Sequence, residues 1–514
     1  MIDLAARRGL GAAILFALLA TACTTGSTGP NAAGYTPTFS ATDCPGQVIG
    51  PATHEATCGY LTVPEDRSDP SGGQIRLFVV RYAPNEPTTA PPVVYAGGDL
   101  GSPSDYFALT AMADHLDGPE VIGLEPRGTG FSEPNLSCPE VDAISPKTLT
   151  APITDPGVRG AFVEAVKTCH DRFVGQGVDL SAYNVEEAGA DLLDLARTLD
   201  LQRWDVLTKG SASRIVFAAM RSGAPGLRSV IASSPEFPDT DTFAQAMEGT
   251  RAAVSNLEML CEADGACARR FPHLTASFDE VLRRFDEHPR TVRVEGANVT
   301  VDGARLLRDL RGLLASVATD VPMYLHLPAT IDALAHAKDP TDPISAVVAP
   351  ERSAPTFCTG YLPWCGQVSQ GAYYSALCTD IAPFADPAAR ASLAGEEAAW
   401  TQDYVNGPYQ DVCGAWDVTP ADPSVTGAVH SDVPVLVLSN GLDPNVAPEV
   451  VRRGIAGFPN AFLVVTPTWG HGGSTIPACP DAMPRNEFLA DPTSAPDASC
   501  QELFRPTFSS SPLK

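Results

Sequence analysis

Short apolar strands alternate with amphipathic helices over much of the sequence, and this alternation limits the chain to few folds. Residues 75–82 and 121–124 have the β-branched and aromatic composition of strands. Residues 186–201 place apolar side chains at helical spacing, and the next apolar strand follows at 204–208. Strands that alternate with helices predict a mostly parallel central sheet with helices on both faces.

A long segment of different character interrupts this pattern. Residues 236–412 form successive helical stretches broken by proline and glycine, without strand alternation. The strand pattern resumes at 433–438. We therefore expect residues 44–235 and 413–514 to build one core, and residues 236–412 to form an inserted helical cap.

The N-terminus has the features of an export signal. Arg7 and Arg8 precede an apolar run that is too short to span a bilayer, and small residues then lead to Cys23. This ending resembles the lipobox of bacterial lipoproteins, which implies a signal peptide over 1–22, lipidation of Cys23 and a flexible linker over 23–43. The protein would then be exported and lipid-anchored, facing outside the cell membrane. The alternative is an ordinary cleaved signal and a secreted protein with an unpaired Cys23.

The thirteen cysteines suit an exported protein, because disulfides persist outside the cytoplasm. If Cys23 carries lipid, twelve remain, and neighbours along the chain suggest six short loops. A metal site is the competing use of cysteine and histidine, but the sequence has no clustered CxxC pair and no HExxH motif, so we predict no metal and no cofactor. The expected pairs are Cys44 with Cys58, Cys138 with Cys169, Cys261 with Cys267, Cys358 with Cys365, Cys378 with Cys413, and Cys479 with Cys500.

The formal net charge is −27 and the pI about 4.6. Such a charge repels nucleic acid and anionic lipid surfaces, so we expect no nucleic-acid partner and no membrane contact except through the N-terminal lipid. The acidic residues are consistent with the solvated surface of an exported protein, or with cationic substrates.

Three residues follow strands in an order that serves nucleophilic catalysis. Ser211 lies in a turn of small residues after strand 204–208, where a nucleophile would sit between strand and helix. Asp443 follows strand 433–438, and His471 stands between glycines after strand 462–466. The histidine could deprotonate the serine hydroxyl while the aspartate orients its other ring nitrogen.

Acyl transfer also needs donors for the developing oxyanion. We expect the amide of Ala212, which follows the predicted nucleophile, and one amide from the first glycine turn, that of Gly98 or Asp99. The turn around Ser211 departs from the G-x-S-x-G pattern, since Lys209 and Ser213 stand at its two glycine positions.

Several motifs together resemble one family. CGYLTVPED at 58–66, RGTGFS at 127–132, VPVLVLSNGLDPNVAPE at 433–449 and the later WGHG are similar to segments of the tripeptidyl-aminopeptidase branch of secreted actinobacterial α/β-hydrolases. The resemblance implies an α/β-hydrolase fold and a serine hydrolase that cleaves short peptides from a free N-terminus, or esters, beneath a helical cap. By position, Ser211, Asp443 and His471 would be its catalytic residues. Glu236, Glu396 and Glu397 are candidates for holding a substrate amine.

Three functions remain open. The first is a cell-surface serine exopeptidase that acts on a peptide or ester substrate through an acyl-enzyme. The second is a binding protein that keeps the fold without turnover, because GGDLG at 97–101 replaces the family's GGPG and Lys209 disturbs the nucleophile turn. The third is an esterase acting on lipids or the cell wall.

Overall fold

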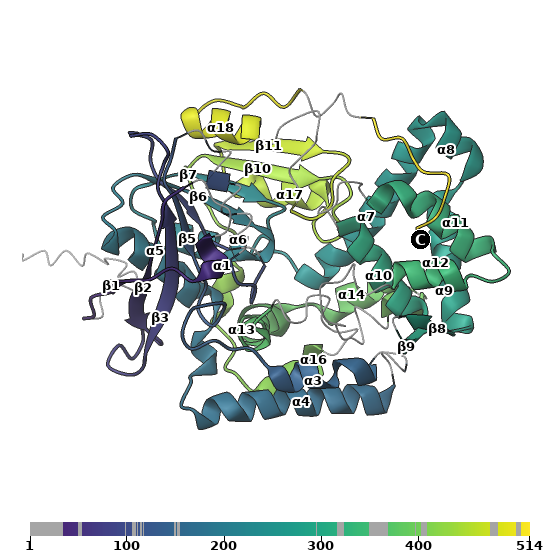
Figure 1. Ribbon diagram of the computed structural model, residues 1–514, viewed down its shortest axis with the longest axis horizontal. Coiled ribbons are helices and arrows are strands. Elements are labelled where there is room, and N and C mark those ends of the chain that lie inside the picture. The colour runs from purple at the N-terminus through teal and green to yellow at the C-terminus, as the bar shows by residue number, and fades with distance from the viewer. Residues whose placement is uncertain are drawn as a thin grey trace, which may run out of the picture.

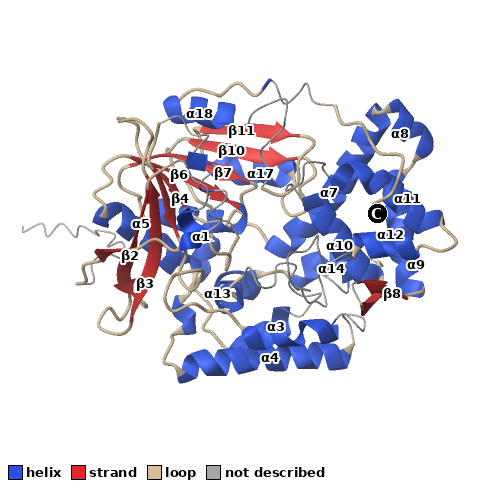
Figure 2. Cartoon of the chain, in the orientation of Figure 1, coloured by secondary structure: helices blue, strands red, loops and turns tan. Residues whose placement is uncertain are grey.

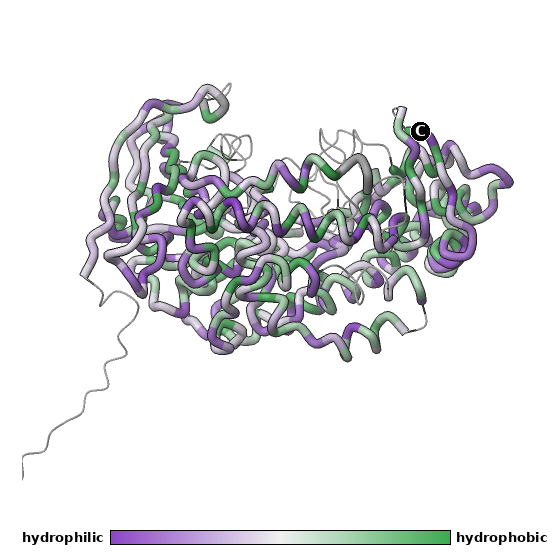
Figure 3. The backbone as a smooth tube through the Cα atoms, turned by 90° about the horizontal axis from the view of Figure 1, so that it is seen from below, coloured by the Kyte–Doolittle hydropathy of each residue, from purple (hydrophilic) through white to green (hydrophobic). Residues whose placement is uncertain are grey.

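The fold is described from a computed structural model. It describes residues 34–49, 54–97, 99–104, 109, 112–113, 116, 118–148, 151, 155–294, 296–315, 323–348, 368–395, 397–401, 409–472, 482–499 and 505–513. The predicted signal peptide and Cys23 lie outside these residues. Among the described residues, no helix combines the length and the apolar composition needed to cross a membrane. Hydrophilic and hydrophobic residues are accordingly interspersed along the coloured backbone (Figure 3).

Nine strands of the described chain form one sheet in the order β1-β2-β3-β5-β4-β6-β7-β10-β11 (Figure 1). The strands from β5 to β11 in this order run parallel, and β1, β2 and β3 join them by antiparallel pairing. The predicted α/β-hydrolase fold with a mostly parallel sheet is confirmed. The bounds are β1 (Thr38–Thr42), β2 (Ala56–Pro64), β3 (Gln74–Tyr82), β4 (Val93–Tyr95), β5 (Val121–Leu124), β6 (Trp204–Lys209), β7 (Leu227–Ser233), β10 (Val435–Asn440) and β11 (Ala461–Thr466).

Both faces of the sheet are buried, each in its own hydrophobic cluster. Successive strand residues point to opposite faces, so Val206 enters one cluster and Leu207 the other. The first cluster is completed by α4 (Pro156–Gly175), α5 (Val185–Thr198), α6 (Ser213–Arg221) and α17 (Pro448–Gly454). The second is completed by α1 (Gly46–Ile49) and α18 (Ala482–Ala490). This two-sided burial fixes the strand ends from which the site is built.

The first strand corrects the predicted linker. Residues 38–42, at the end of the segment expected to be flexible, pair with β2 from Thr38 opposite Thr62 to Thr42 opposite Cys58. The side chains of this edge strand are mostly exposed, so the sequence carries no apolar alternation to reveal it. The sheet therefore begins before residue 44, the predicted start of the core.

Most of the insertion forms a separate hydrophobic core, at the right of Figure 1. It contains a feature that the sequence did not reveal, an antiparallel hairpin of β8 (Arg290–Val294) and β9 (Ala297–Val301), drawn red among blue helices in Figure 2. The C-terminal residues Phe508 and Leu513 also pack into this core. Its helices are α7 (Thr242–Ala263), α8 (Gly265–Arg270), α9 (Leu274–Glu287), α10 (Gly303–Ala315), α11 (Leu327–His336), α12 (Thr341–Val347), α14 (Pro387–Ala394) and α15 (Ala398–Trp400).

One helix inside the predicted cap, and a second that crosses the predicted cap end at residue 412, belong to the main core instead. Residues of α13 (Gln370–Ala376) and α16 (Tyr409–Trp416) pack with the cluster on the first face of the sheet. They lie near α3 (Pro139–Thr148) and α4, below the sheet in Figure 1. The predicted boundaries of 236–412 therefore enclose two structural units, because the chain returns to the main core before the sheet resumes.

Four of the six predicted disulfides are present. They join Cys44 to Cys58, Cys138 to Cys169, Cys261 to Cys267, and Cys378 to Cys413. The other two predicted pairs, Cys358 with Cys365 and Cys479 with Cys500, lie outside the described residues.

Candidate active site

The predicted acid and base lie in direct contact. Asp443 follows β10 and His471 follows β11, and Nδ1 of the histidine is 3.0 Å from Asp443 Oδ2. The backbone amides of Asn445 and Val446 donate to Asp443 Oδ1 at 2.8 and 3.1 Å. Both side chains of the pair are buried. This arrangement orients the imidazole and leaves Nε2 as the atom available for chemistry.

A buried serine holds the histidine loop. Ser234, the residue after β7, has a left-handed backbone with φ of 48°, which is uncommon for a residue other than glycine. Its Oγ accepts hydrogen bonds from the Gly472 amide at 2.9 Å and from Asn440 Nδ2 at 3.4 Å. Ser234 thereby links the ends of three parallel strands next to His471.

The insertion contacts the loops of both residues. Thr250 of α7 donates from its hydroxyl to the Pro444 carbonyl at 3.0 Å, and Asn256 of the same helix donates to the Pro467 carbonyl at 2.7 Å. A Cβ placed on Gly470 would lie 2.2 Å from the carbonyl oxygen of Leu314 in α10. Only glycine allows this approach, so α7 and α10 rest directly on the acid and base loops.

The turn after β6 puts Gly210, and not Ser211, at the place of a nucleophile. In α/β-hydrolases the nucleophile occupies the strained residue of the strand-to-helix turn. Here that residue is Gly210, whose φ is 58°. A Cβ added to Gly210 would lie 3.0 Å from His471 Nε2. The side chain that would face the base is therefore missing.

Ser211 makes other contacts. Its Oγ accepts a hydrogen bond from the Leu100 amide at 2.9 Å and donates to Asp99 Oδ1 at 3.3 Å. His471 Nε2 forms no hydrogen bond with Ser211 and lies 3.5 Å from Asp99 Oδ1. The assignment of Ser211 as the nucleophile is therefore wrong in this geometry, because Ser211 lies one residue beyond the strained position.

The signal that identifies the turn correctly was present in the sequence. The small residues of G-x-S-x-G lie two positions on either side of the nucleophile. Thr208 and Ala212 stand at these distances from Gly210, whereas centring the motif on Ser211 puts Lys209 at a crowded position. The small neighbours were thus a better guide than the serine itself.

A carboxylate fills the space that Gly210 leaves empty. Asp99 Oδ1 accepts from the Ser211 amide at 3.2 Å and lies 3.5 Å from His471 Nε2. The same oxygen is 2.1 Å from the position of a Cβ on Gly210. The Asp99 side chain nevertheless keeps 38% of its surface exposed. It stands close to where the oxygen of a serine at position 210 would be.

The predicted oxyanion donors are only partly recovered. Gly98 lies outside the described residues. The amide that follows the strained position belongs to Ser211 and not to Ala212, so the second predicted donor is corrected by one residue. This amide donates to Asp99 Oδ1, so Asp99 contacts the site through its side chain.

Charge interactions hold His471 protonated. Burial by itself would lower the pKa of His471, but the charges and hydrogen bonds of Asp443 and Asp99 outweigh burial and raise the pKa to about 10. Burial would likewise raise the pKa of Asp99, yet the hydrogen bond and charge of His471, followed by the charge of Lys209, hold it well below the ordinary range. At neutral pH the site is an imidazolium between two carboxylates.

The bulk of Lys209 is accommodated beside the histidine. A Cβ on Gly472 would lie 1.9 Å from Lys209 Cε, and Gly472 has a φ of 64°. The lysine stem therefore occupies space that only a glycine at position 472 leaves free. Lys209 neither fills the nucleophile position nor pairs with Asp443.

One of the three candidate amine-binding carboxylates lies near the site. Glu236 is buried, 3.6 Å from Arg214 Nε, and its charge interacts with those of Asp99 and His471. Burial raises its pKa, against the opposing effect of Arg214. Glu397 pairs with Arg251 at 3.4 Å on the insertion. Glu396 lies outside the described residues.

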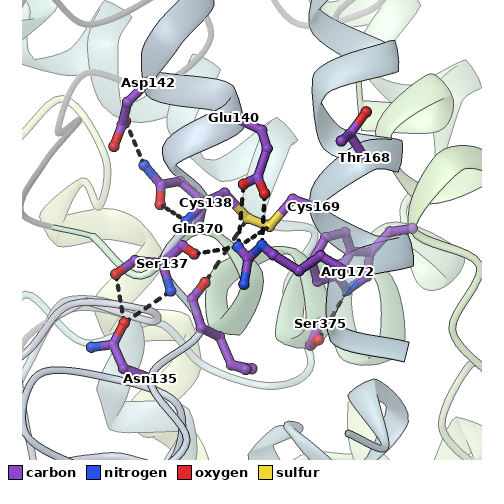
Figure 4. Close-up of a disulfide and its surroundings, with 12 residues drawn as sticks. Asn135, Ser137, Cys138, Glu140, Asp142, Thr168, Cys169, Arg172, Gln370 and Ser375 are labelled. Carbon is purple, nitrogen blue, oxygen red and sulfur yellow. Dashed lines mark hydrogen bonds and ion pairs between the residues drawn. A yellow bond between two sulfur atoms is a disulfide. The ribbon is translucent and has the colours of Figure 1, made fainter. Parts of the chain in front are cut away.

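The described residues contain one group whose atoms are close enough to be metal ligands, namely Cys138, Glu140 and Cys169. The two sulfurs form a disulfide, and Glu140 accepts a hydrogen bond from Arg172 Nε at 2.6 Å (Figure 4). Metal binding by cysteine requires a thiolate, so this group is a structural link between α3 and α4.

Comparisons with known proteins agree with the fold. The family of TAP-like proteins matches residues 397–500. Carboxylesterase B of Mycobacterium tuberculosis is 31% identical over 126 residues, which are 23% of this chain and 24% of that protein. The chain thus spans about a quarter of the length of the curated relatives it matches.

Two solved structures extend the comparison. Proline iminopeptidase of Mycobacterium smegmatis is 14% identical, with 80% of this chain and 91% of that chain covered and a TM-score of 0.34. A thermophilic esterase from Thermogutta terrifontis is 14% identical, with 78% and 88% covered and a TM-score of 0.30.

The matched segment contains both Asp443 and His471. Together with the carboxylesterase match, it agrees with the α/β-hydrolase fold of the chain. Residues 397–500 are thus similar to TAP-like proteins, and the described chain has the α/β-hydrolase fold.

Proposed function

We propose that the protein hydrolyses carboxylic esters or short peptides with the His471–Asp443 pair, and that it does so without a serine acyl-enzyme. The observation that carries this proposal is the position of Gly210. A side chain at this position would face His471 Nε2, but glycine has none. Ser211 is held by Leu100 and Asp99 and cannot take over that role without leaving both partners.

Two substrate types are compatible with the site. A carboxylic ester needs no charged subsite. A peptide with a free N-terminus needs a carboxylate for its amine, and Glu236 is the member of the predicted set that lies near His471. Because Glu236 already pairs with Arg214, we rank esters first and exopeptidase activity second. Export and lipid anchoring at Cys23 remain part of the proposal.

A second function, ligand binding without turnover, has its own supporting observation. The Ser211 amide is occupied by Asp99, and the Leu100 amide is occupied by Ser211 Oγ. Neither amide is free to bind the oxyanion of an incoming acyl group, as acyl transfer normally requires.

Activity and labelling assays together test these functions. We expect the wild-type protein to hydrolyse members of a nitrophenyl ester panel, with peptides bearing free or blocked N-termini as the second panel. His471→Ala should lower kcat by about 1,000-fold, within the range for loss of a general acid or base. A fluorophosphonate probe, which reacts with activated serines, should not label the wild type.

The outcomes separate the alternatives. Labelling that disappears in Ser211→Ala would restore Ser211 as the nucleophile. Hydrolysis that survives unchanged in His471→Ala would contradict the proposed role of the pair. A folded wild-type protein that binds panel members without hydrolysing any of them would favour ligand binding.

A further inference from the structure

The Asp99 carboxylate has a fixed end and a free end. Its Oδ1 accepts from both the amide and the hydroxyl of Ser211, at 3.2 and 3.3 Å. Its Oδ2 forms no hydrogen bond with another described residue, and 38% of the side-chain surface stays exposed. A carboxylate held by one oxygen is oriented for the other to react, as preorganised groups in active sites are.

The same carboxylate stands beside the His471–Asp443 pair. Asp99 Oδ1 is 3.5 Å from His471 Nε2, and the side-chain position of residue 210 is empty. Aspartate carboxylates form covalent intermediates in several enzyme classes. We propose that Asp99 replaces the elbow serine as the nucleophile and forms an acyl intermediate with carboxylic esters. This inference rests on the proposed hydrolase function and names its reacting group.

The charge state of the site suits this chemistry better than it suits a serine. A serine hydroxyl must lose its proton, so its partner histidine must be neutral at the start. An ionised carboxylate attacks without losing a proton. The imidazolium of His471 can instead give its proton to the departing alcohol, which is the acid role that the next step requires.

The reaction balances in two steps. Asp99 Oδ2 bonds to the acyl carbon, the bond from that carbon to the alkoxy oxygen breaks, and the alcohol leaves with the proton from His471 Nε2. Water then gives one proton to neutral His471 and attacks the carboxyl carbon of Asp99. The acyl group departs as a carboxylic acid, which ionises in solvent, and Asp99 keeps one oxygen from the water. The oxyanion of this second step forms on Oδ1, where the Ser211 amide already donates.

Heavy-oxygen labelling tests the step directly. The wild-type protein, in excess over a nitrophenyl ester, is allowed a single turnover in water enriched in heavy oxygen, and its peptides are analysed by mass spectrometry. We expect one heavy oxygen in the peptide that contains Asp99. Label found only in the released acid would overturn the inference.

A matched pair of variants provides the second measurement. Asp99→Asn keeps the size of the side chain but removes its charge, whereas Asp432→Asn makes the same change at an exposed site away from His471. We expect kcat to fall at least about 100-fold in the first variant and to stay unchanged in the second. Circular dichroism and thermal unfolding check that both are folded, and the labelling result does not depend on either variant.

Failure of this inference differs from failure of the proposed function. Hydrolysis that continues at full rate in Asp99→Asn, with no label in the wild-type peptide, overturns the nucleophile alone. Absence of ester hydrolysis by the wild type overturns the proposed function and this inference with it.

Discussion

The two halves of the site differ in how far they depart from serine hydrolysis. The C-terminal half has its acid, its base and the backbone donors to the acid in contact, within a segment that matches a TAP-like family. The N-terminal half has a glycine at the strained turn and an aspartate from another loop beside it. Position in space, and not position in a motif, thus decides which group faces the base.

The largest effect should come from restoring a serine to the turn. Gly210→Ser alone would place a Cβ 2.1 Å from Asp99 Oδ1, so the Asp99 side chain must move in this single variant. Combined with Asp99→Gly, it gives the new hydroxyl space beside His471. We expect fluorophosphonate labelling to rise from background to about one probe per chain, as an activated serine gives.

The control for this gain is Ser211→Ala in the same background, which should leave labelling unchanged. If labelling depends on Ser211, or if the folded double variant is not labelled, position 210 is not the place of a nucleophile beside His471.

The next effect concerns the intact half. Asp443→Asn removes the charge that raises the pKa of His471 and the acceptor of its Nδ1 proton. We expect kcat for ester hydrolysis to fall by about 1,000-fold, and the pKa of His471 measured by NMR to fall from about 10 toward its ordinary value. An unchanged pKa would show that Asp443 does not determine the charge of the base.

The imidazolium also makes stability depend on pH. The folded-state pKa of His471, about 10, lies above the unfolded value, so its stabilising effect is complete at pH values below the unfolded pKa and is lost as the pH rises through about 10. Removing a partner of a buried charge costs about 3 kcal/mol. We therefore expect Asp443→Asn to lose about this much free energy of unfolding near neutral pH. Above neutral pH, the free energy of unfolding of this variant should fall less steeply than that of the wild type.

Urea unfolding across this pH range measures both quantities. The exposed Asp432→Asn variant should reproduce the wild-type curve, and parallel curves for wild type and Asp443→Asn would contradict the charge assignment.

The smallest effect should come from Ser211, although the sequence suggested it as the nucleophile. Ser211→Ala removes the acceptor of the Leu100 amide and one donor to Asp99. Loss of such hydrogen bonds costs about 1 kcal/mol each. We expect a slightly lower Tm and less than about a 10-fold change in kcat. A loss as large as that of Asp99→Asn would return the nucleophile to Ser211.

The sequence predicted the strands and the contact between Asp443 and His471, because both depend on local patterns. Strand 121–124 has the predicted bounds. Asp443 and His471 both follow the ends of strands that the alternation of strands and helices along the sequence identifies. The hairpin of β8 and β9 escaped prediction because it is short and lies between helices. The strand at 38–42 escaped because its side chains are mostly exposed.

The site was harder to predict because its decisive contacts join distant parts of the chain. Asp99 and Gly210 are 111 positions apart in sequence, and only the packed sheet shows that a carboxylate on one fills the space beside the other. A serine next to a glycine is also an easy residue to misplace by one position. The small side chains around the turn show that residue 210 occupies the nucleophile position, whereas the search for a serine points to residue 211.

The contacts of the insertion with the loops of Asp443 and His471 have a mechanical consequence. Because α7 and α10 touch the backbone of these loops through Pro444, Pro467 and Gly470, the insertion cannot swing away from the core without pulling on the acid and the base. An antibody or small molecule that binds the outer surface of α7 and α10 and shifts these helices would therefore also displace the acid and the base.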